Sequence, residues 1–105
     1  SIHAATTADS TAEPQRVCII DIGSNSLKAI VYDTAQQPPV SIGKYDKILG
    51  LAEGMKPNDP KPKLNKEGLA LLFDKALPHC AELIKETKAD LVTVLCTEAD
   101  APWRV

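Results

Sequence analysis

Two short apolar runs constrain the fold of this chain more than any other feature. Residues 17–20 (Val-Cys-Ile-Ile) and 91–96 (Leu-Val-Thr-Val-Leu-Cys) are rich in β-branched side chains and contain almost no polar residue. Runs of this kind are typical of strands that are covered on both faces of a sheet. We therefore expect an α/β fold in which both runs are buried strands.

One helical pattern lies between these two runs. Apolar residues recur at intervals of three and four from Leu69 to Ile84, and charged residues take most other positions. Asn65 is the expected N-cap, and Pro78 predicts a kink because proline lacks an amide hydrogen and clashes with the preceding turn. A helix of this length can act as a crossover connection, so residues 91–96 are predicted to lie parallel to the first run.

Two further strands are predicted before the helix. Residues 27–33 follow a four-residue turn, which fits an antiparallel hairpin with the first run. After a second turn at residues 36–39, residues 40–49 supply a third strand that is interrupted at Gly43. Residues 50–63 contain two glycines and three prolines and are expected to form a loop. The predicted order is strand, strand, strand, helix, strand in a mixed sheet.

The domain organisation follows from composition and from the covering that the strands need. Residues 1–16 are rich in Ala, Thr and Ser without a periodic apolar face, so they are expected to be a disordered N-terminal tail. One helix cannot cover both faces of a four-stranded sheet. We therefore interpret residues 17–105 as the N-terminal part of a larger domain, and the remainder of a parent chain as a partner.

Composition excludes several classes of function. The net charge is −2 without a run of like charges, which argues against a nucleic-acid surface. No apolar run approaches the ~20 residues that a membrane span requires. Cys18, Cys80 and Cys96 lack the paired spacing of zinc ligands and are predicted to be buried free thiols, which favours a reducing, cytoplasmic compartment. A signal peptide cleaved before Ser1 would instead imply export.

The strongest candidate for chemistry is the segment Asp-Ile-Gly-Ser-Asn-Ser that begins at Asp21. Asp21 is expected to emerge at the end of a buried strand, and Gly23 lets backbone amides approach an anion closely. Ser24, Asn25 and Ser26 add hydroxyl and amide donors, while Asp21 can orient a water bound to Mg²⁺. The same residues also suit an ordinary hairpin turn with an exposed aspartate. The spacing alone leaves both interpretations open.

Three segments together resemble one protein family. Residues 17–32 look like the opening of the exopolyphosphatase and guanosine pentaphosphate phosphohydrolase family, whose first phosphate loop has the form Asp-x-Gly-Ser-Asn-Ser. Residues 49–55 (Leu-Gly-Leu-Ala-Glu-Gly-Met) are similar to its Arg-Leu-x-Glu-Gly-Leu segment, and residues 97–99 (Thr-Glu-Ala) stand where it has Thr-x-Ala-x-Arg. The first landmark also occurs in sugar kinases; the second and third favour the phosphatases.

The resemblance implies a fold, a reaction and a set of site residues. The fold would be that of the actin-like ATPases, built on a ribonuclease-H-like core. The reaction would be the Mg²⁺-assisted release of terminal phosphate from polyphosphate or a hyperphosphorylated guanosine nucleotide such as guanosine pentaphosphate. Asp21 would contact the metal through a water, and Gly23, Ser24, Asn25 and Ser26 would contact phosphate. A second copy of the chain is a further candidate partner.

Departures from the family pattern keep other functions open. The arginine of Thr-x-Ala-x-Arg falls on Ala101, and the nearest arginine is Arg104. The catalytic glutamate of the family would lie beyond Val105, so the parent is expected to be an enzyme and the 105-residue chain alone inactive. A non-catalytic relative that binds a nucleotide or another polyanion is one alternative, and a carbohydrate kinase is another. Glu53 matches a family position that loop structure explains equally well.

Overall fold

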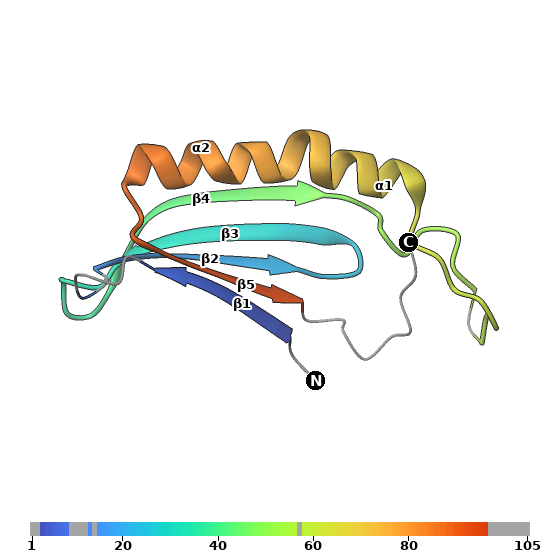
Figure 1. Ribbon diagram of the computed structural model, residues 1–105, viewed down its shortest axis with the longest axis horizontal. Coiled ribbons are helices and arrows are strands. Elements are labelled where there is room, and N and C mark those ends of the chain that lie inside the picture. The colour runs from blue at the N-terminus through green and yellow to red at the C-terminus, as the bar shows by residue number, and fades with distance from the viewer. Residues whose placement is uncertain (1–2, 9–12, 14, 57, 97–105) are drawn as a thin grey trace.

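The structure is a computed structural model that describes residues 3–8, 13, 15–56 and 58–96. It consists of a five-stranded mixed sheet with one helical segment packed against it (Figure 1). The strands lie side by side in the order β1-β5-β2-β3-β4. Their bounds are β1 (His3–Ala8), β2 (Arg16–Ile22), β3 (Ser26–Asp33), β4 (Val40–Ile48) and β5 (Leu91–Cys96).

Two strand pairings are those that the sequence predicted: the hairpin of β2 with β3 and the parallel pair of β2 with β5. β2 and β3 form an antiparallel hairpin, β4 lies antiparallel to β3, and β5 lies parallel to β2. The chain from β2 to β5 runs through β3, β4 and the helical segment, which supplies the long crossover connection that parallel neighbours need. The predicted α/β class and the order strand, strand, strand, helix, strand are therefore confirmed.

β1 is a strand that the sequence analysis did not predict. Residues 1–16 were expected to be a disordered tail, but residues 3–8 pair antiparallel with β5, from His3 opposite Cys96 to Ala8 opposite Leu91. The local composition resembles that of a solvated segment. The strand depends instead on backbone hydrogen bonds to a partner about ninety residues away, which a local pattern does not reveal. Its effect is to pair the side of β5 that would otherwise be a sheet edge.

The helical segment is built from α1 (Lys66–Leu71), η1 (Leu72–Ala76) and α2 (Leu77–Thr87). Asn65 is its N-cap, as predicted: the side-chain oxygen accepts a hydrogen bond of 2.9 Å from the amide of Gly68. None of the helices in the described part of the chain is long and apolar enough to cross a membrane.

A π-helical turn takes the place of the kink predicted at Pro78. In η1 the hydrogen bonds skip one residue further than in an α-helix, and the amide of Leu77 donates to the carbonyl of Leu72. Pro78 follows directly, without an amide hydrogen to continue the regular pattern. A widened turn before the proline accommodates this defect, so the helical segment continues through it.

The core lies between the helical segment and the sheet. Alternate residues of β2 and β3 face the helix and are at most 3% exposed: Cys18, Ile20, Leu27, Ala29 and Val31. The helical segment contributes Leu72, Ala76 and Cys80. Cys18 and Cys80 are thus buried free thiols, as predicted, while Cys96 is half-buried.

Candidate functional site

The candidate loop joins β2 to β3 at one end of the sheet (Figure 1). Asp21 was predicted to follow the first strand, but β2 extends to Ile22, so Asp21 is the penultimate strand residue and lies opposite Lys28. Ser26 likewise is the first residue of β3. The turn between the strands is closed by a hydrogen bond of 2.9 Å from the amide of Gly23 to the carbonyl of Ser26.

Residues 49–52, which follow β4, donate hydrogen bonds to the carbonyl oxygens of this turn. The amides of Leu49 and Gly50 both donate to the carbonyl oxygen of Asn25, at 2.7 and 2.9 Å. The amide of Ala52 donates to the carbonyl oxygen of Ser24 at 3.0 Å. Two segments that the sequence identified separately, the loop and the stretch after the third predicted strand, therefore form one hydrogen-bonded unit.

Apart from the amide of Gly23, the hydrogen-bond donors of the turn have no partner within the described residues. There, the backbone amides of Ser24 and Asn25 donate to no acceptor. The hydroxyls of Ser24 and Ser26 and the side-chain amide of Asn25 make no hydrogen bond there either. Asn25 is exposed, and both serines are half-buried. A turn whose carbonyls are occupied and whose amides and hydroxyls are free is suited to holding an anion.

Asp21 carries a buried oxygen that has no hydrogen-bond partner in the described part of the chain. Strand alternation places its side chain on the face of the sheet opposite the helix, because the adjacent Ile20 belongs to the core. The Oδ1 atom is buried, and no described residue hydrogen-bonds to it. A buried polar atom in this state costs about 1–3 kcal/mol. This oxygen is therefore expected to interact with a group other than the described side chains, such as a water or an ion.

Among the residues that the structure describes, no cluster of protein ligands accompanies this carboxylate. The described residues contain no group of three or more His, Cys, Asp or Glu side chains that could hold a metal ion. Glu53, the acidic residue of the segment after β4, is exposed, and its amide closes a turn by donating to the carbonyl of Gly50 at 3.0 Å. Its position is accounted for by that turn.

The start of the helical segment packs against residues 49–52, the supporting stretch that bonds to the turn. The amide of Asn65 donates to the carbonyl of Leu51 at 2.8 Å. Gly68 is buried, and a Cβ atom placed there would lie 2.7 Å from the carbonyl oxygen of Leu49. Leu49 and Leu51 are themselves core residues, at 4% and 5% exposure. The helix, the supporting stretch and the turn thus form three successive layers of contact, which the sequence analysis did not detect.

The third landmark of the resemblance, residues 97–99, lies outside the described residues, as do Ala101 and Arg104. β5 runs up to Cys96, which lies opposite Ile22 in the parallel register. The carboxyl ends of β2 and β5 therefore lie side by side at the same end of the sheet. The candidate turn lies at this end as well.

Solved structures of phosphatases share this fold. The chain matches the type II variant of the Aquifex aeolicus Ppx/GppA phosphatase with a TM-score of 0.61 and 24% identity, over 72% of this chain and 24% of that chain. For an exopolyphosphatase from Cytophaga hutchinsonii the TM-score is 0.63 and the identity 22%, over 74% of this chain and 24% of that chain. For a further structure of the Aquifex aeolicus PPX-GPPA enzyme the values are 0.63 and 25%, over 76% and 25%.

These matches place the likeness in the fold. No family model matches the sequence, and no curated protein matches it. The chain spans about a quarter of the length of the solved structures that it matches. It has the fold of part of a Ppx/GppA phosphatase, as the sequence resemblance predicted.

Proposed function

We propose that this chain, which has the fold of part of a Ppx/GppA phosphatase, supplies the first phosphate-binding portion of a phosphoanhydride hydrolase. The intact parent would release terminal phosphate from polyphosphate or guanosine pentaphosphate. The observation that carries the proposal is the turn between β2 and β3: the carbonyls of Ser24 and Asn25 are occupied, while the amides and side-chain donors of these two residues have no partner among the described residues. The shared fold supports the class of enzyme.

In this proposal the turn binds the oxygens of a phosphate group. The amides of Ser24 and Asn25 and the hydroxyls of Ser24 and Ser26 are the donors, and Gly23 has no side chain to hinder an approaching anion. Phosphoryl transfer depends mainly on positioning and on neutralising charge, so donors that are already held in place are effective. The hydrogen bonds from the stretch after β4 provide that support.

Asp21 fits a contact to Mg²⁺ through a water molecule. Mg²⁺ usually retains several waters and is held by one or two carboxylates together with substrate phosphates. A single carboxylate with a buried, unpartnered oxygen meets that requirement without further ligands from the described residues. When bound, the ion would neutralise charge on the phosphates. The part of Asp21 is to accept a hydrogen bond from the coordinated water and to hold it in one orientation.

Phosphate release by the intact parent is the direct test. Asp21→Asn retains the size of the side chain and removes its charge, and we expect kcat/KM to fall by about a hundredfold or more. The matched control is Asp74→Asn, an exposed helix residue whose substitution should leave the rate unchanged. Undiminished activity of Asp21→Asn would refute the assignment.

The turn can be tested separately on the 105-residue chain. Titration with tripolyphosphate in the presence of Mg²⁺ should shift the backbone amide resonances of Ser24 and Asn25 in nuclear magnetic resonance spectra. Amides of the exposed helix surface, such as that of Glu82, should not shift. Absence of shifts at the turn at saturating ligand would remove it from the phosphate site even if the parent is active.

A second candidate function is favoured by one position in the sequence. Ala101 stands where the family has the arginine of Thr-x-Ala-x-Arg, so a cation expected to clamp phosphate is missing from that position. The parent would then be a non-catalytic relative that binds a guanosine nucleotide or another polyanion. Calorimetry that shows tight binding of guanosine tetraphosphate without turnover would support this function, and measurable phosphate release would exclude it.

A further inference from the structure

β4 forms one edge of the sheet, and within the described chain it pairs only with β3 (Figure 1). The free side of an edge strand presents unpaired backbone N–H and C=O groups, to which another strand can add. β4 is nine residues long, and several of its side chains are apolar and exposed: Val40 at 41%, Ile42 at 38% and Ile48 at 71%. This is the kind of edge that natural proteins either protect or use.

The two faces of β4 have different surroundings. Gly43 and Tyr45 face the helical segment: a Cβ on Gly43 would lie 2.9 Å from a methyl group of Leu83, and the ring of Tyr45 stacks on His79. Between Gly43 and Ile48 the strand alternates regularly, so Lys44, Asp46 and Ile48 lie on the opposite face. These three residues are exposed, as is Ile42, which occupies a bulge that shifts the register with β3.

The exposed side chains on this face of β4 form a self-complementary pattern. If two β4 strands run antiparallel with Tyr45 opposite Tyr45 of the other copy, Lys44 of each copy lies opposite Asp46 of the other. In the same register Ile48 of each copy lies near the bulge residue Ile42 of the other. Opposite charges and apolar side chains that face each other across an antiparallel pair stabilise it, and like charges destabilise it. The register therefore places each of the two charged residues opposite a residue of opposite charge and brings the apolar side chains of Ile48 and Ile42 near each other.

We propose that two copies of this chain associate through β4, antiparallel and centred on Tyr45, to form one continuous sheet of two halves. Such a contact is isologous, which is the commonest arrangement in soluble homodimers. Charged residues on an edge strand normally oppose addition of another strand. Here Lys44 and Asp46 have opposite signs and lie two residues apart, so they disfavour an unrelated strand and favour a second copy.

The bulge in β4 is compatible with this contact. It occurs at Ile42, between the pair of Val31 with Gly43 and the pair of Tyr32 with Ser41. Residues 43–48 remain in regular register with β3. The bulge thus lies at one end of the proposed pairing and leaves its centre regular.

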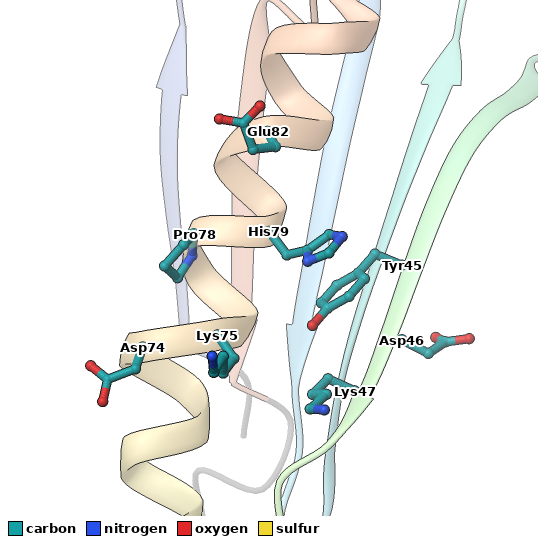
Figure 2. Close-up of a pocket in the computed structure, with 8 residues that line it drawn as sticks. All are labelled: Tyr45, Asp46, Lys47, Asp74, Lys75, Pro78, His79 and Glu82. Atoms are coloured by element: carbon teal, nitrogen blue, oxygen red, sulfur yellow. The ribbon is translucent and has the colours of Figure 1, made fainter.

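A groove beside β4 gives room for the side chains of an added strand. It has a volume of about 490 Å³ and lies between β4 and the helical segment, lined among others by Lys47, Pro78 and Glu82 (Figure 2). The rings of Tyr45 and His79 stack in it with their centroids 4.4 Å apart, while Asp46 points away from the helix. On this side the other copy would contribute its own Tyr45 and Lys47.

Charge exchange tests the proposal without reference to the enzymatic function. Lys44→Asp places Asp opposite Asp across the interface, and Asp46→Lys places Lys opposite Lys. We expect each variant of the 105-residue chain to raise the dimer dissociation constant by about tenfold in sedimentation equilibrium. An equimolar mixture of the two variants restores opposite charges in every pair, so the mixture should form heterodimers with nearly the affinity of the unaltered chain.

The outcomes separate this contact from others. Association through β1, the opposite edge, would be unaffected by either variant and would overturn the proposal. So would an unaltered chain that stays monomeric across the micromolar range, or a mixture that associates no better than its components. Circular dichroism verifies the fold of each variant. If one fails to fold, Ile48→Lys replaces it: this side chain is mostly exposed in one copy, so its substitution should weaken the dimer and spare the fold.

Discussion

The carbonyl oxygen of Asn25 accepts a hydrogen bond of 2.7 Å from the amide of Leu49, which ties the candidate phosphate turn to the stretch after β4. The amide of the next residue, Gly50, reaches the same oxygen at 2.9 Å, and it does so with a backbone φ of 66°. Side chains other than that of glycine rarely adopt this conformation. The geometry behind the turn therefore depends on a glycine at this position.

Gly50→Ala is expected to destabilise the chain by about 1–2 kcal/mol, because alanine is strained at positive φ. It should also weaken the binding of tripolyphosphate, since the support of Asn25 is disturbed. Gly54→Ala is the matched control: Gly54 has a φ of 82° and open space around it, and it donates no hydrogen bond to the turn. Urea denaturation should show a similar loss of stability for both variants. Calorimetry should show weaker binding of tripolyphosphate for Gly50→Ala alone. Equal binding of tripolyphosphate by the two variants would contradict the proposed support of the turn by Gly50.

Gly68→Ala tests the contact beneath the supporting stretch. Alanine is the better helix former by about 1 kcal/mol, so an exposed glycine replaced in this way would stabilise the helix. Here the added methyl group would lie 2.7 Å from the carbonyl oxygen of Leu49 and 3.2 Å from the Cα of Leu51, both backbone atoms. We expect a net destabilisation of about 1–3 kcal/mol in urea denaturation.

The control for Gly68→Ala is Glu67→Ala, which lies in the same turn and is exposed. Its effect should stay within about 0.5 kcal/mol. A Gly68→Ala chain that is more stable than the original would show that the helix start does not press on the stretch after β4.

Local patterns were sufficient to predict most of the fold. The apolar runs of β2 and β5, the hairpin after Asp21 and the cap at Asn65 are each set by residues close together in sequence. Their period and composition carry the information directly. The parallel pairing of β5 with β2 followed because a crossover helix leaves few other topologies.

Features that depend on distant residues were not predictable in this way. β1 exists through its pairing with β5, and the local composition of residues 3–8 gives no sign of it. The bonds from Leu49 and Gly50 to Asn25 join positions more than twenty residues apart. The burial of the Oδ1 atom of Asp21 likewise depends on how strands assemble around it. The types of the candidate site residues were visible in the sequence, whereas their mutual support was not.

Lys88 ends α2 in a conformation that favours glycine. Its φ is 55° and its ψ is 41°, in the left-handed region, and the amide of the following Ala89 donates to the carbonyl of Ile84 at 3.1 Å. This is the usual position of glycine at the end of a helix. Lys88→Gly should therefore stabilise the chain by about 1 kcal/mol in urea denaturation. Lys85→Gly, within the helix three residues earlier, should destabilise it by about the same amount, and equal signs for the two would contradict the assigned cap.

The buried thiols predict a loss of stability in alkaline solution. Burial, and secondarily the neighbouring thiol of Cys18, raises the pKa of Cys80 from its ordinary 9.0 to about 11. In the unfolded chain Cys80 ionises from about pH 9, while in the folded chain it keeps its proton to about pH 11. Its contribution to stability is therefore fully present below pH 9 and is lost progressively as the pH rises towards 11.

Cys80→Ala isolates this effect from the titration of other groups. The variant loses core packing at every pH, because Cys80 is only 1% exposed, but it no longer releases this proton on unfolding. The free energy of unfolding of the original chain should thus fall more steeply above pH 9 than that of the variant, and the gap between them should narrow. Urea denaturation of both chains below and above pH 9 measures this difference in the free energy of unfolding. A gap that stays constant would show that Cys80 ionises equally easily in the folded and unfolded chains.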